Sequence, residues 1–206
     1  ALGNLQPLQV FDDPKSWFKL NDQEPIALGD MDAILMRKDP PFDMEYVYAT
    51  YILERAEDSG AVVVNRPQSL RDANEKAFVS WFPDCAPPTL ISRSMDLLRE
   101  FMQEHGRAIV KPLDQMAGRS VFVTGIDDPN RNALLETMTE RGSQYVMAQM
   151  YIPEIVESGD ARILLIDGKP VPQALVRIPP NDDHRGNISS GANTYCRPHN
   201  NDEQRN

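Results

Sequence analysis

The chain has 206 residues, of which 41% are hydrophobic and 25% are charged, and these proportions are typical of a soluble globular protein. Its net charge of −10 argues against nucleic acid or an anionic membrane as a partner, since both are bound through basic surfaces. No apolar run approaches the roughly 20 residues that a membrane-spanning helix needs.

The first part of the chain alternates predicted strands with a helix. Strands are expected at residues 8–11, 32–36 and 61–64, and Asp43 is placed to cap a helix that ends at Gly60. This order favours a parallel strand pair, which is half of a doubly wound α/β domain. The residues expected to form the buried stripe of the helix are Met44, Val47, Tyr48, Tyr51 and Ile52.

The middle of the chain is interrupted by prolines. Residues 67–74 are predicted to be a linker or short turn, and residues 75–82 an amphipathic helical segment. A short strand is expected at 89–91, and Ser94 can cap a further helix that Gly106 ends. The predicted buried face of that helix consists of Leu97, Leu98, Phe101 and Met102.

The last part of the chain is richer in strands and is expected to be α+β. A hairpin of residues 162–166 and 171–178 is predicted to turn at Asp167-Gly168, because Asp-Gly is the usual signal for a primed turn. We place a domain boundary after residue 73, so that residues 1–73 form a partial doubly wound domain and residues 74–206 a second domain. The other expected elements are strands at 107–111, 120–124 and 144–150 and a helix at 130–141.

One loop raises the question of phosphate binding. Residues 109–122, "IVKPLDQMAGRSVF", join two apolar runs through a loop with a single glycine, Gly118, that follows Lys111. Loops that wrap phosphates are usually rich in glycine, since backbone amides approach an anion most closely where no Cβ intervenes. The pattern alone fits either a nucleotide loop or an ordinary hairpin connection.

Other residues can converge on a ligand from the edges of predicted elements. On an alternating strand, Arg162 shares a face with Leu164 and Ile166, although a snorkelling side chain explains such a position equally well. The run "QMYIP" at 149–153 can match an adenine edge through its backbone, but a core strand that ends at a proline is the simpler interpretation. The basic residues at such edges are Lys76, Lys111, Arg162 and Arg177.

The cysteines and histidines predict neither disulfides nor a metal site. Cys85 and Cys196 are too isolated to form a disulfide framework, which favours the reducing cytoplasm as the location. His105, His184 and His199 lack the spacing of metal ligands.

Several long strings of the chain point to one family. "MRKDPPFD", "YATYILERAE", "VVNRPQSLRDANEK", "IVKPLD" and "MAQMYIPEI" resemble the bacterial type of glutathione synthetase, a member of the ATP-grasp superfamily. The resemblance extends from about residue 28 to residue 191. It is specific, because the strings are long and idiosyncratic rather than degenerate motifs.

The resemblance implies an ATP-dependent ligase that joins γ-glutamylcysteine to glycine through an acylphosphate, with Mg²⁺, or else Mn²⁺, as the metal. It also implies a homotetramer for the full-length protein. Residues implied in nucleotide binding are Lys76, Lys111, Asp114, Gln115, Met116, Ala117, Gly118, Gln149, Met150, Tyr151, Ile152 and Asp160. Residues implied in substrate binding are Arg37, Asp39, Arg162, Arg177, Arg185 and Asn187, and among these Arg162 and Arg185 are implied in catalysis.

The chain departs from the family pattern in its loops. The family writes its phosphate loop as Asp-Gly-Met-Gly-Gly, whereas here Gln115 and Ala117 add Cβ atoms where close approach or a positive φ is needed. Ala161 replaces a lysine, and residues 189–192 read Ser-Ser-Gly-Ala instead of Ala-Ala-Gly-Gly. Both ends look truncated, and the family's Mg²⁺ ligands are expected beyond residue 206, so the 206-residue chain alone is predicted to be inactive.

Two further interpretations stay open. The first is a catalytically degenerate relative that binds a nucleotide or peptide, which the single-glycine loop favours. The second is another ATP-grasp carboxylate–amine ligase, which is less favoured because the string "RKDPPFD" belongs to the substrate side. The apolar-poor residues 181–206 are interpreted either as an unstructured terminus or as an active-site loop.

Overall fold

The computed structural model describes residues 1–38 and 41–198 and divides the chain into two compact units. The first unit is Ala1–Asn74 and the second is Glu75–Asn206. Each unit has its own strands and helices, and each is described by itself below. None of the helices in the described ranges combines the length and apolar composition that crossing a bilayer requires.

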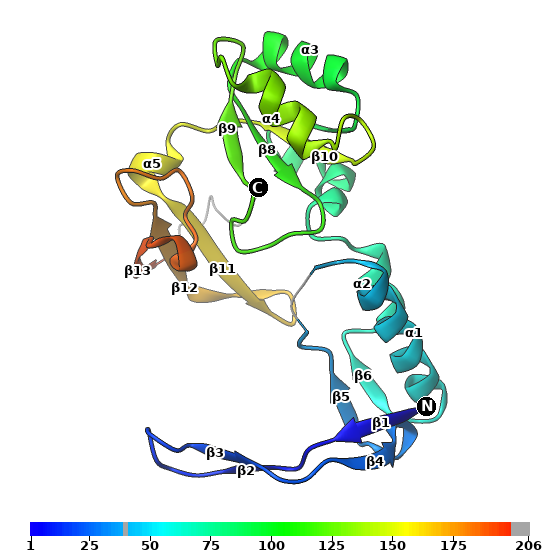
Figure 1. Cartoon of the computed structure of the whole chain (residues 1–206). Helices are drawn as coiled ribbons and strands as arrows, with labels where there is room; N and C mark the ends of the chain where they lie inside the picture. The colour runs from blue at the N-terminus through cyan, green and yellow to red at the C-terminus, as the bar shows by residue number, and fades with distance from the viewer. Residues whose placement is uncertain (39–40, 199–206) are drawn as a thin grey trace. The chain divides into compact units, whose positions relative to one another are not determined.

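The first unit begins with a long antiparallel ribbon. Strand β1 (Leu2–Leu5) pairs with β4 (Glu24–Ala27), and β2 (Leu8–Val10) pairs with β3 (Phe18–Leu20). In Figure 1 the β2–β3 end of this ribbon extends away from the rest of the unit. Its base is anchored where the short 3₁₀ turn Leu28–Asp30 buries Leu28 against Ala56 and Ala61.

A parallel strand–helix–strand element completes the core of the first unit, as the sequence predicts. Strands β5 (Ala33–Leu35) and β6 (Val62–Val64) pair in parallel, with helix α1 (Met44–Asp58) between them in sequence. Helix α1 begins where the Asp43 carboxylate accepts a hydrogen bond from the Tyr46 amide at 2.8 Å.

The predicted buried stripe of α1 is wrong. Thr50 and Ala56 are the buried residues of the helix, whereas Met44, Tyr48, Tyr51 and Ile52 are 48% to 55% exposed. Val47 is half-buried, Ile52 lines an open hollow beside β5, and the Tyr51 ring lies under the Arg71 guanidinium, so the short β5–β6 pair leaves most of the large apolar side chains partly in solvent.

The segment predicted as a linker at residues 67–74 contains a helix, α2 (Pro67–Asp72), with Pro67 at its first position, where a missing amide proton costs nothing. Arg71 ties α2 to α1, since its guanidinium donates to both Glu54 carboxylate oxygens at 2.9 and 3.1 Å and to the Thr50 hydroxyl at 3.0 Å. A tertiary ion pair therefore stabilises a helix that is too short to be recognised from its sequence.

The second unit contains a four-stranded antiparallel sheet in the order β7-β10-β8-β9. Its strands are β7 (Thr89–Ser92), β8 (Ala108–Pro112), β9 (Phe122–Thr124) and β10 (Val146–Met150), and its helices are α3 (Met95–His105) and α4 (Arg131–Met138). Both helices pack on one face of the sheet. The buried cluster between them comprises Leu98, Phe101, Met102, Ala108, Val110, Leu135, Val146 and Ala148.

Two predictions in this region need correction. Leu97 is 49% exposed, because it points away from the sheet that buries Leu98 one residue later. Residues 75–82 do not form an α-helix but a 3₁₀ segment, Ala77–Trp81, followed by a second 3₁₀ turn, Pro83–Cys85. Ser94 caps α3 as expected, accepting from the Leu97 amide at 3.4 Å.

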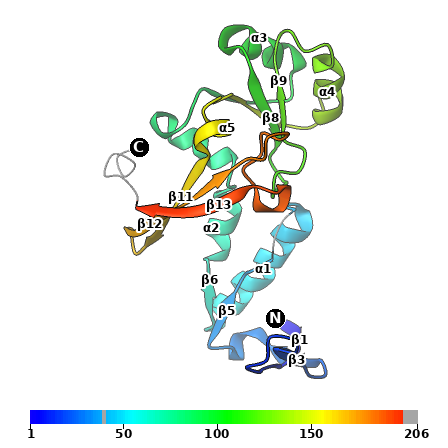
Figure 2. The ribbon, with the colours of Figure 1, turned by 90° about the vertical axis from the view of Figure 1, so that its left-hand side faces the viewer.

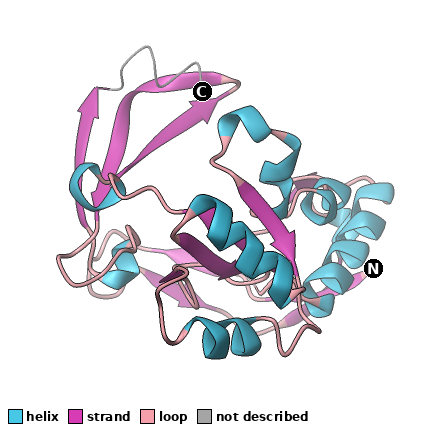
Figure 3. Cartoon of the chain, turned by 90° about the horizontal axis from the view of Figure 1, so that it is seen from above, coloured by secondary structure: helices cyan, strands magenta, loops and turns pink. Residues whose placement is uncertain are grey.

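A second sheet of this unit has three antiparallel strands in the order β11-β12-β13. These are β11 (Asp160–Ile166), β12 (Lys169–Ile178) and β13 (Asn193–Pro198), and they lie side by side in Figures 2 and 3. Helix α5 (Ile155–Ser158) precedes them, and a 3₁₀ turn (Ile188–Ser190) precedes β13. Strand β13 falls in the region that the sequence suggested to be unstructured or a loop.

The β11–β12 turn confirms the Asp-Gly prediction, because Asp167 and Gly168 have φ of 51° and 73°, as a type I′ turn requires. The strict alternation predicted for β11 is wrong. A register shift between Ile163 and Leu165 interrupts it, and Leu164, Leu165 and Ile166 are all exposed.

The sheet–helix core of the second unit makes a testable prediction. We expect Leu98→Ala to lower the free energy of unfolding by about 3 kcal/mol, because it leaves a cavity in a fully buried site. The matched variant Leu97→Ala, one residue away and half exposed, should cost less than about 1 kcal/mol. Urea denaturation followed by circular dichroism measures both, and equal losses would contradict the assignment of the buried face.

Candidate functional site

A pocket of about 460 Å³ lies within the second unit, lined by residues of both of its sheets and of the loops between them. Its wall combines the loop after β8, the ends of β11 and β12 and the segment 184–187. Of the residues implied by the resemblance, the pocket gathers Lys76, Lys111, Gln115, Met116, Ala117, Gly118, Asp160, Arg162, Arg177, Arg185 and Asn187.

Two lysines from distant parts of the chain meet in this pocket. The Lys76 ammonium donates to the Glu75 carboxylate at 3.0 Å and to the Gln115 carbonyl, and the Lys111 ammonium donates to the Gln149 side-chain oxygen at 3.0 Å. Burial lowers the pKa of Lys111, the charge of Lys76 lowers it further, and Glu75 opposes the shift. An anion placed between the two lysines would relieve their repulsion, so the geometry suits a phosphate group.

The loop between β8 and β9 takes up backbone conformations that glycine normally supplies. Ala117, Gly118 and Ser120 have φ of 58°, 74° and 53°. A Cβ on Gly118 would also lie 2.7 Å from the Asn187 side-chain oxygen, so both the backbone conformation and this contact favour glycine here. The concern over Cβ atoms therefore applies to Ala117 through its positive φ, whereas Gln115 is not among the residues with positive φ.

Arg177 and Asp160 form an ion pair across β11 and β12. The Arg177 Nε atom donates to Asp160 Oδ1 at 2.7 Å and its Nη2 atom donates to Oδ2, while Arg177 is 9% exposed. The hydrogen bond to Asp160 raises the pKa of Arg177. Gly159 allows this close packing, since a Cβ there would lie 2.5 Å from the Arg177 carbonyl oxygen. The charge of Arg177 is thus largely compensated within the protein.

Arg185 joins two loops of the pocket. Its Nη1 atom donates to the Gly118 carbonyl at 3.2 Å, and its Nε and Nη2 atoms donate to Asp183 Oδ2 at 2.9 and 2.6 Å. The hydrogen bond from Arg185 lowers the pKa of Asp183 to about 2. Ser189 adds a longer contact, donating to the Ala117 carbonyl at 3.4 Å.

Several implied residues do not line the pocket. Gln149 points its side chain at Lys111, and the Tyr151 ring lies 5.1 Å from the Arg107 guanidinium. Arg37 lies in the first unit, in a separate hollow of about 330 Å³ on β5 and α1, and Asp39 lies outside the described residues. The others absent from the lining are Asp114, Met150 and Ile152.

The pocket also contains residues that the sequence did not single out. Glu75 is paired with Lys76, and the His184 Nε2 atom lies 3.2 Å from the Val121 carbonyl oxygen. Their position next to Lys76 and Arg185 in sequence was the available signal. The remaining additional lining residues are Ile109, Val121 and Ile155, and Gly186 lines the pocket between Arg185 and Asn187.

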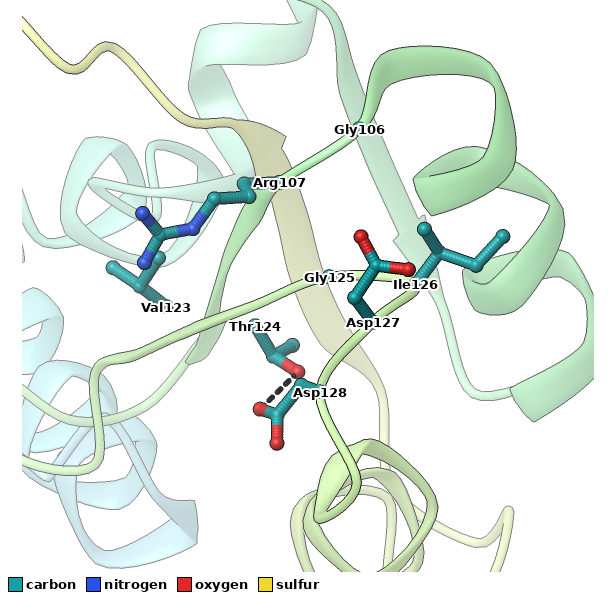
Figure 4. A pocket seen from close by; sticks show the side chains of 8 residues that line it. All are labelled: Gly106, Arg107, Val123, Thr124, Gly125, Ile126, Asp127 and Asp128. Atoms are coloured by element: carbon teal, nitrogen blue, oxygen red, sulfur yellow. Dashed lines mark hydrogen bonds between the residues drawn. The ribbon is translucent and has the colours of Figure 1, made fainter.

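A second hollow of the same unit, about 260 Å³, has different chemistry (Figure 4). Here the Thr124 hydroxyl donates to Asp128 at 2.8 Å, a contact that lowers the pKa of Asp128, and Asp127 lies nearby. Its cationic side chain, Arg107, already lies over the Tyr151 ring. Two carboxylates make this hollow less suited to an anion than the lysine pocket.

Comparison with known proteins gives matches over both units. Residues 1–71 match the family model "Prokaryotic glutathione synthetase, N-terminal domain", and residues 75–205 match "Prokaryotic glutathione synthetase, ATP-grasp domain". The chain is 54% identical over 198 residues to glutathione synthetase of Pseudomonas aeruginosa, covering 96% of this chain and 62% of that protein. It is also 54% identical over 191 residues to the Coxiella burnetii protein, covering 93% and 59%. The chain thus spans about three fifths of the length of these relatives.

Solved structures share the fold at low sequence identity. The structure of D-cycloserine synthetase DcsG matches with a TM-score of 0.66 at 16% sequence identity. The match covers 87% of this chain and 64% of the DcsG chain. D-alanyl-alanine synthetase A from Vibrio cholerae has a TM-score of 0.53 at 13% identity, with coverage of 93% and 58%. These likenesses support the architecture alone.

The Arg185–Asp183 pair predicts a pH dependence of stability. The folded-state pKa of Asp183 is about 2, below its ordinary value of 3.8. The contribution of the ion pair to the free energy of unfolding is therefore present above pH 4 and is lost as the pH falls toward 2. We expect Asp183→Asn to lose less stability than the wild type over this interval. Urea denaturation between pH 5 and pH 2 measures the slopes. The neighbouring exposed variant Asp182→Asn should keep the wild-type slope, and a wild-type slope in Asp183→Asn would refute the assignment.

The strained loop makes a further prediction. Ala117→Gly should raise the free energy of unfolding by up to about 1 kcal/mol, because a left-handed conformation costs alanine more than glycine. The control Ala161→Gly, in strand β11, should instead lower it by roughly 0.5–1 kcal/mol. Thermal or urea denaturation distinguishes the two, and destabilisation by both changes would contradict the strain at Ala117.

Proposed function

This chain belongs to the prokaryotic glutathione synthetase family, and on that premise we propose that it acts in the ATP-dependent joining of γ-glutamylcysteine to glycine. The observation that carries the proposal is the pair Lys76 and Lys111 in one half-buried pocket. Such a pocket favours a polyphosphate over a neutral ligand, because the anion compensates two converging positive charges.

The reaction couples two steps. The γ-phosphate of ATP passes to the carboxylate of the dipeptide, and the glycine amine then attacks the acylphosphate and displaces phosphate. We assign Lys76 and Lys111 to the nucleotide phosphates, where their charges balance the negative charge that develops during transfer. Residues 115–118 of the loop after β8 line the same pocket and would help to exclude water from it.

The arginines of the pocket are proposed to have two different roles. Arg162 and Arg185 are proposed to hold the substrate carboxylate and the acylphosphate, since both line the pocket. Arg185 also links the phosphate loop to Asp183, so its contact with Gly118 would place it beside the transferred group. Arg177 and Asp160 satisfy each other, and we propose that they shape the wall that Asn187 and Gly186 complete.

The use of a divalent metal ion is proposed from membership of the family alone. Among residues 1–38 and 41–198, no group of three or more His, Cys, Asp or Glu side chains is arranged to hold a metal ion. Mg²⁺ is usually held by one or two carboxylates together with waters and substrate phosphates, so the metal is proposed to bind with the nucleotide rather than in a site made by protein side chains alone.

A second function is favoured by one observation. Ala117 occupies a left-handed conformation in the phosphate loop, which is consistent with a relative that binds a nucleotide or peptide without turnover. Nucleotide binding is common to both functions, and only phosphate release that requires both γ-glutamylcysteine and glycine supports ligation. Another amino acid or peptide as substrate is the remaining alternative.

The cellular setting is proposed on similar grounds. Cys85 and Cys196 are free and exposed, which suits a reducing compartment, and we propose the cytoplasm. A homotetramer is proposed from the family alone.

The lysine pair supplies the test. Lys111→Met and Lys76→Met should each weaken binding of a non-hydrolysable ATP analogue with Mg²⁺ by about 10- to 100-fold, the range for a lost charge-assisted hydrogen bond. Lys169→Met, an exposed lysine at the start of β12, is the matched control and should bind as the wild type does. Isothermal titration calorimetry gives the affinities. Wild-type affinity in both pocket variants would rule out the assignment.

A further inference from the structure

Three adjacent strands of the four-stranded sheet bring one polar side chain each to the face that is turned away from α3 and α4. Thr89 of β7 is directly opposite Gln149 of β10, and Gln149 is opposite Ile109 of β8, two residues before Lys111. The other face of the same strands carries the buried cluster with Val110. Alternation along the strands therefore places Thr89, Gln149 and Lys111 together on the side of the candidate site.

These three side chains form a continuous hydrogen-bonded chain. The Thr89 hydroxyl donates to the Pro87 carbonyl at 2.7 Å. The Gln149 Nε2 atom donates to the Thr89 hydroxyl oxygen at 2.9 Å, and the Lys111 ammonium donates to Gln149 Oε1 at 3.0 Å. All of these groups are partly buried, so water replaces a lost partner less readily than it would at the surface.

The direction of this series of hydrogen bonds follows from the chemistry of the groups at its two ends, Lys111 and the Pro87 carbonyl. Lysine ammonium has only donors, so the Gln149 atom that faces Lys111 must be the oxygen. At the other end the hydroxyl proton of Thr89 is used by the Pro87 carbonyl, so the hydroxyl oxygen can only accept from Gln149. The Pro87 carbonyl, acting through Thr89, and the Lys111 ammonium thus favour the same orientation of the Gln149 amide.

We propose that Thr89 is a positioning residue for Lys111, because its hydroxyl fixes the Gln149 amide with the oxygen toward the ammonium. This inference rests on the proposed function, in which Lys111 holds nucleotide phosphates. It reassigns the Gln149 side chain, since both atoms of its amide are already engaged within the sheet. Without the threonine hydroxyl the Gln149 NH₂ group loses its acceptor, so the amide is held from the lysine side alone and its oxygen is less firmly placed against the ammonium.

Lys111 is surrounded by charged groups from several other segments of the second unit. Lys76 and Glu75 act on it from the start of the second unit, with opposite effects on its pKa. Across the pocket lie Asp160, Arg162, Arg177 and Arg185. Threonine at position 89 is uncharged, so replacing it alters Lys111 only through the Gln149 amide and not through a direct change of the field.

The test compares Thr89→Val, which removes the hydroxyl at nearly constant shape, with Thr89→Ser, which keeps it. The pKa of Lys111, followed by NMR of its side chain in the ligand-free protein, should fall in Thr89→Val and remain at the wild-type value in Thr89→Ser. Affinity for a non-hydrolysable ATP analogue with Mg²⁺ should weaken about three- to tenfold in the valine variant, and its pH dependence should follow the lowered pKa. The serine variant should bind within about twofold of the wild type.

Gln149→Met provides an independent arm if the valine variant folds poorly. It should reproduce the lowered pKa of Lys111, and adding Thr89→Val should change that pKa no further, because the two residues act in series. An unchanged Lys111 pKa in a folded Thr89→Val variant, or additive effects in the double variant, would overturn the proposal. If the wild type binds no ATP analogue, the proposed function fails, while the ligand-free NMR measurement still decides the role of Thr89.

Discussion

The repulsion between two neighbouring ammonium groups is the constraint on which the candidate site depends. Lys76 and Lys111 come from different elements of the second unit, and burial makes the positive charge of Lys111 costly. The Gln149 amide oxygen and the nearby charge of Glu75 offset this cost at Lys111, and the Glu75 carboxylate and the Gln115 carbonyl accept hydrogen bonds from Lys76. In a chain with a net charge of −10, this local excess of positive charge is maintained against the overall balance, which is why it indicates an anionic ligand.

The two faces of the four-stranded sheet have different roles, since one face packs the hydrophobic core and the other carries polar side chains of the candidate site. On one face Val110, Val146 and Ala148 pack under α3 and α4 in a cluster with no exposed members among them. On the other face Lys111 and Gln149 are half-buried and meet the pocket side. Because successive residues of a strand alternate, a single strand such as β8 anchors the fold and positions the lysine at the same time.

Local rules allowed much of this to be predicted from the sequence. Asp43 and Ser94 form the expected caps, Asp167-Gly168 forms the expected turn, and long strings such as "RKDPPFD" and "NRPQSLRDANEK" pointed to the family. These features depend on residues close together in the chain. What failed depends on partners far away in sequence: the exposed side of α1, the short helix held by Arg71, the exposed Leu97, and the strand β13 that forms only by pairing with β12. The direction of the Gln149 side chain belongs to the same class, since it is set by Thr89 sixty residues away.

The contact between Gly118 and Asn187 also bears on how this loop can change over evolutionary time. A methyl group at position 118 would approach the Asn187 side-chain oxygen to 2.7 Å, and the positive φ there disfavours any side chain. A larger residue at 118 would have to displace the Asn187 side chain and would add a third non-glycine residue with positive φ to a loop that already holds Ala117 and Ser120 in that conformation. Two separate costs therefore favour glycine at this position, and both act whether or not a ligand is bound, so selection for a stable loop is enough to retain it.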